Sequence, residues 1–111
     1  MMGRRSTLPW TAAWSMAATA LLWTGAQAAD PAQIQVKDFM FMPTALTVNA
    51  GAQVSWVNKD DEPHTVVSDT GLLRSGAMDT NESYSFKFEK AGTYHFTCSI
   101  HPRMVGTIVV K

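Results

Sequence analysis

Beyond its N-terminal segment, the chain alternates hydrophobic and polar residues with a period of two. The clearest case is residues 83–88, where Tyr84, Phe86 and Phe88 alternate with polar side chains. Successive side chains of a strand point to opposite faces of a sheet, so this pattern predicts a strand with one apolar face. Residues 90–92, which end in glycine, predict a short hairpin turn from this strand into the next one.

Shorter alternating segments lie on both sides of that strand. Residues 34–41 and 52–58 alternate before it, and residues 93–98 and 105–110 after it, with Gly, Asn, Asp or Pro between segments. Since no helical period persists beyond about one turn, we expect an all-β protein, an antiparallel β-sandwich of about seven or eight strands. The last strands need partners far away in sequence, which favours a Greek-key arrangement.

The N-terminal segment has a different composition. Arg4 and Arg5 precede an uncharged run from Trp10 to Thr24, and residues 26–28 read Ala-Gln-Ala. This order is typical of a signal peptide, so we expect residues 1–28 to be removed by cleavage after Ala28. A membrane span needs about 20 apolar residues, so we expect no stable membrane insertion. Ordinary secretion is favoured over twin-arginine export, because the aromatic residue usual in that signal is missing.

Residues 29–111 would then form one small domain. The sequence holds nine basic and nine acidic residues, and losing Arg4 and Arg5 leaves seven against nine, a formal charge of about −2. That sign argues against a nucleic-acid partner, which would require a basic face. We expect an exported, periplasmic monomer.

Cys98 is the only cysteine, so the chain cannot form an internal disulfide. Metal binding is another common source of stability for a domain of this size. If Tyr94 and Phe96 face the core, the alternation places Cys98 on the same side and His95 on the opposite side. We therefore expect Cys98 to point inward, and we do not expect His95 to be a ligand.

Several potential metal ligands surround this cysteine. After Cys98 the alternation stops, and His101 and Met104 follow at intervals of three residues, so a tight loop can direct all three side chains to one point. A further donor is His64, preceded by Pro63, at the predicted start of a strand. Two imidazoles, one thiolate and one thioether form the donor set of a blue-copper electron-transfer site. Zinc is the main competing metal, but structural zinc sites rarely use methionine.

With its export signal, strand-rich body, Pro-His pair and Cys-x-x-His-x-x-Met motif, the chain resembles the cupredoxins, the type 1 copper proteins. The resemblance covers essentially all of residues 29–111. The two-residue spacings of the motif are most similar to the amicyanin and pseudoazurin branch. The resemblance implies one copper ion, with an axial methionine, held by His64, Cys98, His101 and Met104.

Two positions differ from the pattern of the family. Thr65 follows the first ligand where Asn is common; its hydroxyl could replace part of the hydrogen bonding of Asn, and its backbone N–H remains available to the Cys98 sulfur. Arg103 lies between His101 and Met104, where an apolar residue is frequent. We expect its charge to alter the surface that partners touch.

The predicted function is one-electron transfer. Four ligands leave no open coordination position for a substrate, and a CuA-type centre would need a second cysteine, so we do not expect an enzyme. Electrons would pass through the exposed edge of His101. The partner would be a redox protein (a dehydrogenase, cytochrome, reductase or oxidase) docking near His101, Pro63 and Pro102, with Met42 or Met78 as further candidates for the patch.

Two alternatives remain open at this point. The first is copper delivery, storage or resistance without electron transfer, which the absence of Met-rich and His-rich tracts disfavours. The second is a structural domain that binds no copper. The acidic residues Asp60, Asp61 and Glu62 are expected to form a solvated loop or part of a docking surface.

Overall fold

A computed structural model of the protein describes residue 3 and residues 32–111. The signal peptide expected at residues 1–28, with its cleavage site, lies outside the described residues apart from that single position. Within the described part, no helix is long and apolar enough to cross a membrane.

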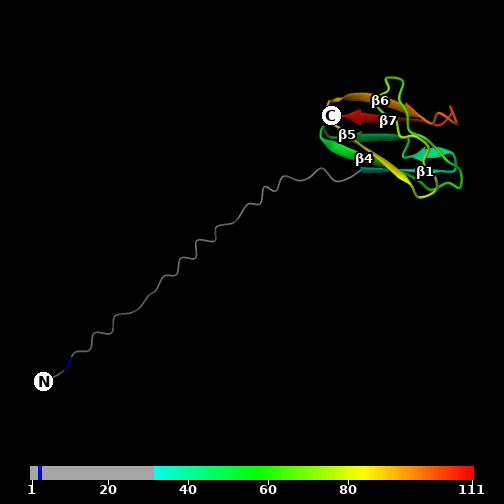
Figure 1. Ribbon diagram of the computed structural model, residues 1–111. Helices are drawn as coiled ribbons and strands as arrows, with labels where there is room; N and C mark the ends of the chain where they lie inside the picture. The colour runs from blue at the N-terminus through cyan, green and yellow to red at the C-terminus, as the bar shows by residue number, and fades with distance from the viewer. Residues whose placement is uncertain (1–2, 4–31) are drawn as a thin grey trace.

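Residues 32–111 form seven strands in two sheets, which lie as two layers in Figure 1. The first sheet has the order β2-β1-β4-β5 and consists of β1 (Ala32–Lys37), β2 (Met40–Met42), β4 (Ala52–Asn58) and β5 (Ser83–Phe88). The second has the order β3-β7-β6 and consists of β3 (Ala45–Val48), β6 (Gly92–Thr97) and β7 (Val105–Val110). The predicted all-β sandwich is confirmed.

The direction of strand pairing differs in part from the expectation. Three pairs are antiparallel, β1 with β2, β4 with β5 and β6 with β7, whereas β1–β4 and β3–β7 are parallel. The sheets are therefore mixed, because the chain crosses between the layers before it returns to form the parallel pairs. The β3–β7 pair, in which Ala45 lies opposite Thr107, joins segments far apart in the sequence, as expected.

The hairpin turn expected at residues 90–92 does not form, and residues 89–91 instead connect β5 to β6. They carry the chain from β5 in one sheet to β6 in the other. This crossing places the ring of Phe88 next to that of Tyr94, with centroids 5.0 Å apart. A hairpin would have placed β5 and β6 side by side in one sheet. Their apolar faces could then not pack against each other across the sandwich.

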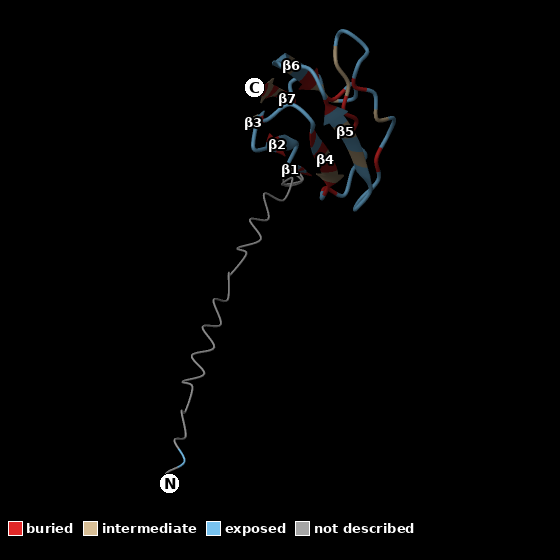
Figure 2. Ribbon diagram, turned by 90° about the vertical axis from the view of Figure 1, so that its left-hand side faces the viewer, coloured by how far each residue is buried: buried red, intermediate tan, exposed pale blue. Residues whose placement is uncertain are grey.

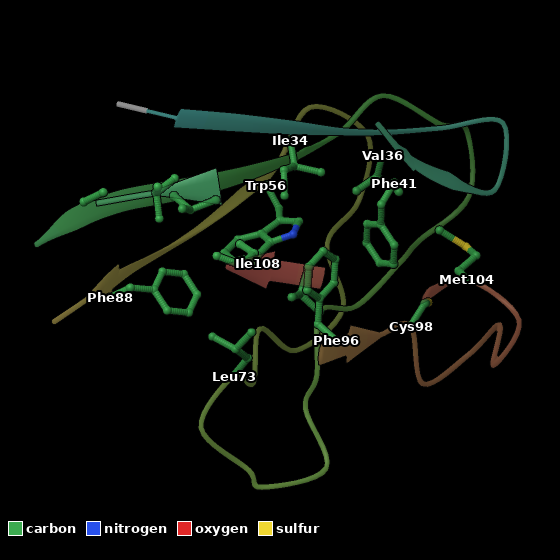
Figure 3. Packing of buried hydrophobic residues seen from close by; sticks show 14 of the residues in the cluster. Ile34, Val36, Phe41, Trp56, Leu73, Phe88, Phe96, Cys98, Met104 and Ile108 are labelled. Carbon is green, nitrogen blue, oxygen red and sulfur yellow. The ribbon is translucent and has the colours of Figure 1, made fainter. Parts of the chain in front are cut away.

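The hydrophobic core lies between the sheets and is centred on Trp56 of β4 (Figure 3). Its indole packs edge-on against Phe96, with centroids 5.4 Å apart, and Phe41 packs on the same Phe96 ring at 4.8 Å. Each aromatic pair of this kind contributes about 0.5–1.5 kcal/mol beyond the burial of its area. Buried and partly exposed positions alternate along β4, as Figure 2 shows. Cys98 and Met104 lie at one end of this cluster (Figure 3).

One glycine is required where the final strand passes the core. A Cβ atom at Gly106 of β7 would overlap the ring of Phe96 on the adjacent β6. The absence of a side chain at this position lets Phe96 lie close against β7. The strand that leads to Cys98 is thereby fixed against its neighbour.

Residues 34–41 form two strands instead of the single alternating segment that the sequence indicates. Asp38 and Phe39, between β1 and β2, both have left-handed backbone conformations, with φ of 53° and 58°. Two successive residues of this kind form the tight turn that suits the twist of a β-hairpin, although such φ values are uncommon outside glycine. As a result Phe41 is buried, whereas Phe39 lies at the tip of the hairpin with 46% of its surface exposed.

Candidate metal centre

Strand β6 delivers the cysteine. Phe96 and Cys98 are both buried, and Cys98 lies just beyond the end of the strand. His95 is exposed on the opposite side, with its Nδ1 atom 3.1 Å from the hydroxyl of Thr107 on β7. The alternation therefore placed Cys98 and His95 correctly.

The loop after Cys98 is closed by two backbone hydrogen bonds. The Met104 N–H donates to the carbonyl of His101 at 2.9 Å, and the Cys98 N–H donates to the carbonyl of Met104 at 3.2 Å. Met104 is buried, whereas the side chain of His101 is 28% exposed. The loop thus turns its cysteine and methionine toward the core and leaves its histidine at the surface.

His64 comes from the long connection between β4 and β5. It lies in an isolated bridge with Met78 and not at the start of a strand as expected. The His64 N–H donates to the Met78 carbonyl at 3.1 Å, and the Met78 N–H donates to the His64 carbonyl at 2.8 Å. The side chain of His64 is fully buried. The two reciprocal hydrogen bonds fix the backbone of a residue that no regular strand supports.

The structure brings three of the predicted ligands together. His64, Cys98 and His101 offer donor atoms that all lie within 4.8 Å of one another. The Nδ1 atoms of both histidines lie 3.8 Å from the Cys98 sulfur. Met104 is buried in the same cluster as Cys98, at the end of the core shown in Figure 3. Imidazole nitrogens, a thiolate and a thioether are the donors that copper takes in electron-transfer sites, so the residues fit this metal.

The surroundings of Cys98 favour its thiolate. The backbone N–H of Thr65 donates to the sulfur at 3.3 Å, and the Thr65 hydroxyl lies 3.8 Å from it. Burial by itself would raise the pKa of Cys98, but the hydrogen bond from the Thr65 amide and the contacts of the sulfur with the His64 and His101 rings outweigh it and lower the pKa from 9.0 to about 6. Because the thiolate is the form that binds metal, the site is prepared for a metal at neutral pH.

Thr65 also connects the two ligand segments. Its hydroxyl oxygen accepts a hydrogen bond from the Ser99 N–H at 2.8 Å and lies 2.8 Å from the Ser99 hydroxyl. The expectation that Thr65 supplies hydrogen bonds to the ligand loop is confirmed. The connection beside His64 is in this way tied to the loop that carries His101.

Asp60 is a residue of the site that the sequence did not reveal. It is only 7% exposed, and its carboxylate accepts hydrogen bonds from the N–H groups of Asp38 at 2.6 Å and Phe39 at 3.0 Å. Its Oδ2 atom lies 2.8 Å from Nε2 of His64. Burial opposes ionisation, but the Phe39 and Asp38 amides and His64 together hold the pKa of Asp60 below its usual value. The expectation of a solvated acidic loop is thus wrong for Asp60 and correct for its exposed neighbour Asp61.

An apolar surface surrounds the exposed side of His101. Six residues line an open hollow at this point: Phe39, Ile100, His101, Pro102, Arg103 and Met104. The Phe39 ring packs edge-on against both histidines, with centroids 4.9 Å from His101 and 5.4 Å from His64. Met78, a candidate for this surface in the sequence, is buried instead, and its backbone is paired with that of His64. The sequence pattern gave no signal for Phe39, since it placed this residue within a continuous strand.

The model of one protein family, the cupredoxin-like domain, matches residues 7–110. Amicyanin-alpha of Methylorubrum extorquens is 30% identical over 108 residues, which cover 87% of this chain and 91% of that protein. The plastocyanin of Scenedesmus fuscus is 39% identical over 85 residues, which cover 65% of this chain and 87% of that protein.

The solved structures that resemble this chain include an amicyanin, as the sequence relatives do. The crystal structure of amicyanin from Paracoccus versutus matches with a TM-score of 0.70 and 30% identity, covering 75% of this chain and 83% of that one. A copper-containing nitrite reductase from Thermus scotoductus matches with a TM-score of 0.69 and 29% identity, covering 73% of this chain but 22% of the reductase.

Proposed function

Because the chain belongs to the cupredoxin-like family, we propose that it is a small type 1 copper protein that carries single electrons between redox proteins. The observation that carries this proposal is the convergence of His64, Cys98 and His101, whose donor atoms lie within 4.8 Å, with Met104 buried beside them. When bound, copper supplies a one-electron couple between Cu(I) and Cu(II). The four residues would be its ligands.

The construction of the site suits electron transfer. Cys98 and His64 are fully buried, and backbone hydrogen bonds fix the segments on which they lie. Donors held in this way change position little when the charge of the metal changes, so little reorganisation opposes the transfer of an electron. His101 alone among the four reaches the surface to an appreciable extent, which supports its exposed edge as the point of entry and exit.

The redox partner would dock around that edge. Phe39, Ile100 and Pro102 are exposed and line the hollow beside His101, so a partner with an apolar contact surface could approach the ring closely. Pro63 is also exposed and directly precedes His64. We place the protein in the periplasm as a monomer, after export and cleavage behind Ala28. A dehydrogenase, cytochrome, reductase or oxidase would fit as the partner.

The proposed role is that of a carrier without catalytic activity. With four donors of this chain around one ion, no coordination position is left for a substrate. The likeness to the nitrite reductase concerns 22% of that protein, so it supports a shared domain fold and not a shared reaction.

The proposal can be tested against copper delivery by comparing two rates on the copper-loaded protein. We expect rapid electron self-exchange, measured from NMR line broadening in mixtures of the oxidised and reduced forms. We expect slow loss of copper to a competing chelator, because Cys98 and His64 are inaccessible. Rapid loss of copper combined with negligible self-exchange would favour delivery and contradict the proposal.

A further inference from the structure

Asp60 joins two parts of the molecule that are distant in sequence. Its Oδ1 atom accepts the Asp38 N–H, whereas Oδ2 accepts the Phe39 N–H and lies 2.8 Å from Nε2 of His64. The contacting ring is fully buried and the carboxylate nearly so. One carboxylate therefore contacts both the proposed metal ligand His64 and the hairpin tip that carries Phe39.

These contacts determine which ring nitrogen of His64 carries a proton. An ionised carboxylate has no proton to donate, so Nε2 must be the donor in the 2.8 Å contact. In a neutral imidazole, Nδ1 is then left with its lone pair. That nitrogen is the one directed toward the Cys98 sulfur, 3.8 Å away. The ring is thus held in the tautomer that can bind a metal ion inside the cluster.

The geometry points to Asp60 as the positioning residue of the metal centre: it keeps the proton of His64 on Nε2 and strengthens Nδ1 as a donor to Cu(II). This inference rests on the proposed function, since His64 is taken as a copper ligand. A carboxylate that accepts from a ligand imidazole raises the basicity of that ligand, and loss of such a partner commonly lowers metal affinity by about 10- to 100-fold. A more basic ligand favours Cu(II) over Cu(I), so Asp60 lowers the reduction potential.

The same carboxylate holds Phe39 against the two histidines. Asp38 and Phe39 have φ values of 53° and 58°, a conformation that residues other than glycine adopt at some cost. Asp60 satisfies the N–H groups of both residues and so supports this turn. The Phe39 ring then lies 5.4 Å from His64 and 4.9 Å from His101, between centroids. Asp60 accordingly fixes the position of Phe39 on the docking surface as well as the tautomer of His64.

The first test uses the wild-type, copper-free protein. Long-range ¹H–¹⁵N correlation spectra of the labelled protein at pH 8 report which nitrogen of each histidine is protonated. We expect His64 to carry its proton on Nε2. A proton on Nδ1 would overturn the inference, and this measurement depends neither on copper nor on a variant that folds.

The second test compares Asp60→Asn with Asp61→Asn, which removes the same charge from an exposed neighbour. The uncharged amide that Asp60→Asn introduces is a weaker acceptor for the Nε2 proton of His64, so we expect a detectable fraction of His64 to carry its proton on Nδ1 in the copper-free variant. In the copper-loaded protein we expect the ratio of Cu(II) to Cu(I) affinity to fall by about tenfold, an upward shift of about 59 mV for a one-electron couple. Asp61→Asn should change neither property.

The outcomes separate this inference from the proposed function. If Cu(II) gives the blue colour but Asp60→Asn leaves both the tautomer and the potential as in Asp61→Asn, the inference is wrong and the function stands. If wild-type protein stays colourless with Cu(II), the proposed function is wrong. The spectra of the copper-free protein still show which nitrogen of His64 carries the proton.

Discussion

The two histidines of the cluster lie in contrasting surroundings. His64 is fully buried, hydrogen-bonded to Asp60 and paired through its backbone with Met78. His101 lies on a short loop with 28% of its side chain exposed, and its Nε2 atom is 3.9 Å from the carboxylate of the exposed Glu62.

This difference assigns separate tasks to the two sides of the site. The His64 side is held by the sandwich and by buried hydrogen bonds, so it can fix the geometry of a metal ion. The His101 side is a loop on a rigid scaffold, which is where proteins commonly place contacts with other molecules. The site therefore has a fixed inner wall, with His64, and an accessible outer wall, with His101.

The largest expected effect comes from removing each ring in turn. His101→Gly should bind Cu(II) without the wild-type spectrum, and added imidazole should restore the band because the vacated position opens to solvent. His64→Gly should not be restored, because its position is enclosed and Asp60 would be left without its partner. Visible absorption with and without imidazole checks both variants, and circular dichroism checks that they fold. If imidazole restored the band equally in both variants, the positions of His64 and His101 would be equally accessible and the distinction between the two walls would be wrong.

The second effect is the pH dependence of the folding stability that the buried Cys98 thiolate contributes. The folded pKa of Cys98, about 6, lies below the ordinary value of 9.0, so its thiolate stabilises the folded protein above pH 9 and this stabilisation is lost as the pH falls toward 6. A shift of this size corresponds to at most about 4 kcal/mol. In urea denaturation of the copper-free protein, the stability of wild type relative to Cys98→Ser should therefore rise between pH 6 and 9. If the difference in unfolding free energy between wild type and Cys98→Ser stayed constant across that range, folding would not lower the pKa of Cys98.

The third effect concerns the outer wall alone. Pro102→Glu places a charge in the hollow beside His101, so the approach of two molecules should be hindered and electron self-exchange slowed by about tenfold or more. The visible spectrum should not change, since Pro102 is not a proposed ligand. Leu72→Glu is the matched control, because Leu72 is apolar, 45% exposed and outside that hollow. If both variants exchange electrons at the same rate as wild type, the route does not pass through this surface.

The smallest effect concerns the hydrogen bonds between the two walls. Thr65→Val keeps the shape of the side chain and the backbone N–H to Cys98, but it removes the oxygen bonded to Ser99. We expect the copper-free protein to lose about 1 kcal/mol of unfolding free energy, the usual contribution of such a bond. Chemical denaturation of wild type and Thr65→Val measures this difference. An unchanged stability would mean that the two segments hold their positions independently.

The loop that carries Cys98, His101 and Met104 was more accessible to prediction than the surroundings of His64. Cys98, His101 and Met104 are close in sequence, and the alternation along β6 fixes the direction of the cysteine, so local spacing is enough to bring them together. The Thr65 contacts also followed from its position next to His64. These features depend on a few neighbouring residues and one strand.

The inner wall depends on contacts between distant segments. Nothing in the three successive acidic residues distinguishes buried Asp60 from exposed Asp61, because its burial results from the turn at Asp38 and Phe39. That turn interrupts a pattern that reads as one strand. For the same reason the parallel pairing of β1 with β4 and the passage of the chain between the sheets after β5 were not predicted. Periodicity reports which face of a strand is apolar and not which strand lies beside it.

The most direct test is the visible spectrum of the protein titrated with Cu(II). A thiolate bound to Cu(II) in a site of this kind should give an intense charge-transfer band that grows to one equivalent of copper, and Cys98→Ser should show none. A colourless wild-type protein, or a Cys98→Ser variant that keeps the band, would contradict a copper centre built on His64, Cys98, His101 and Met104.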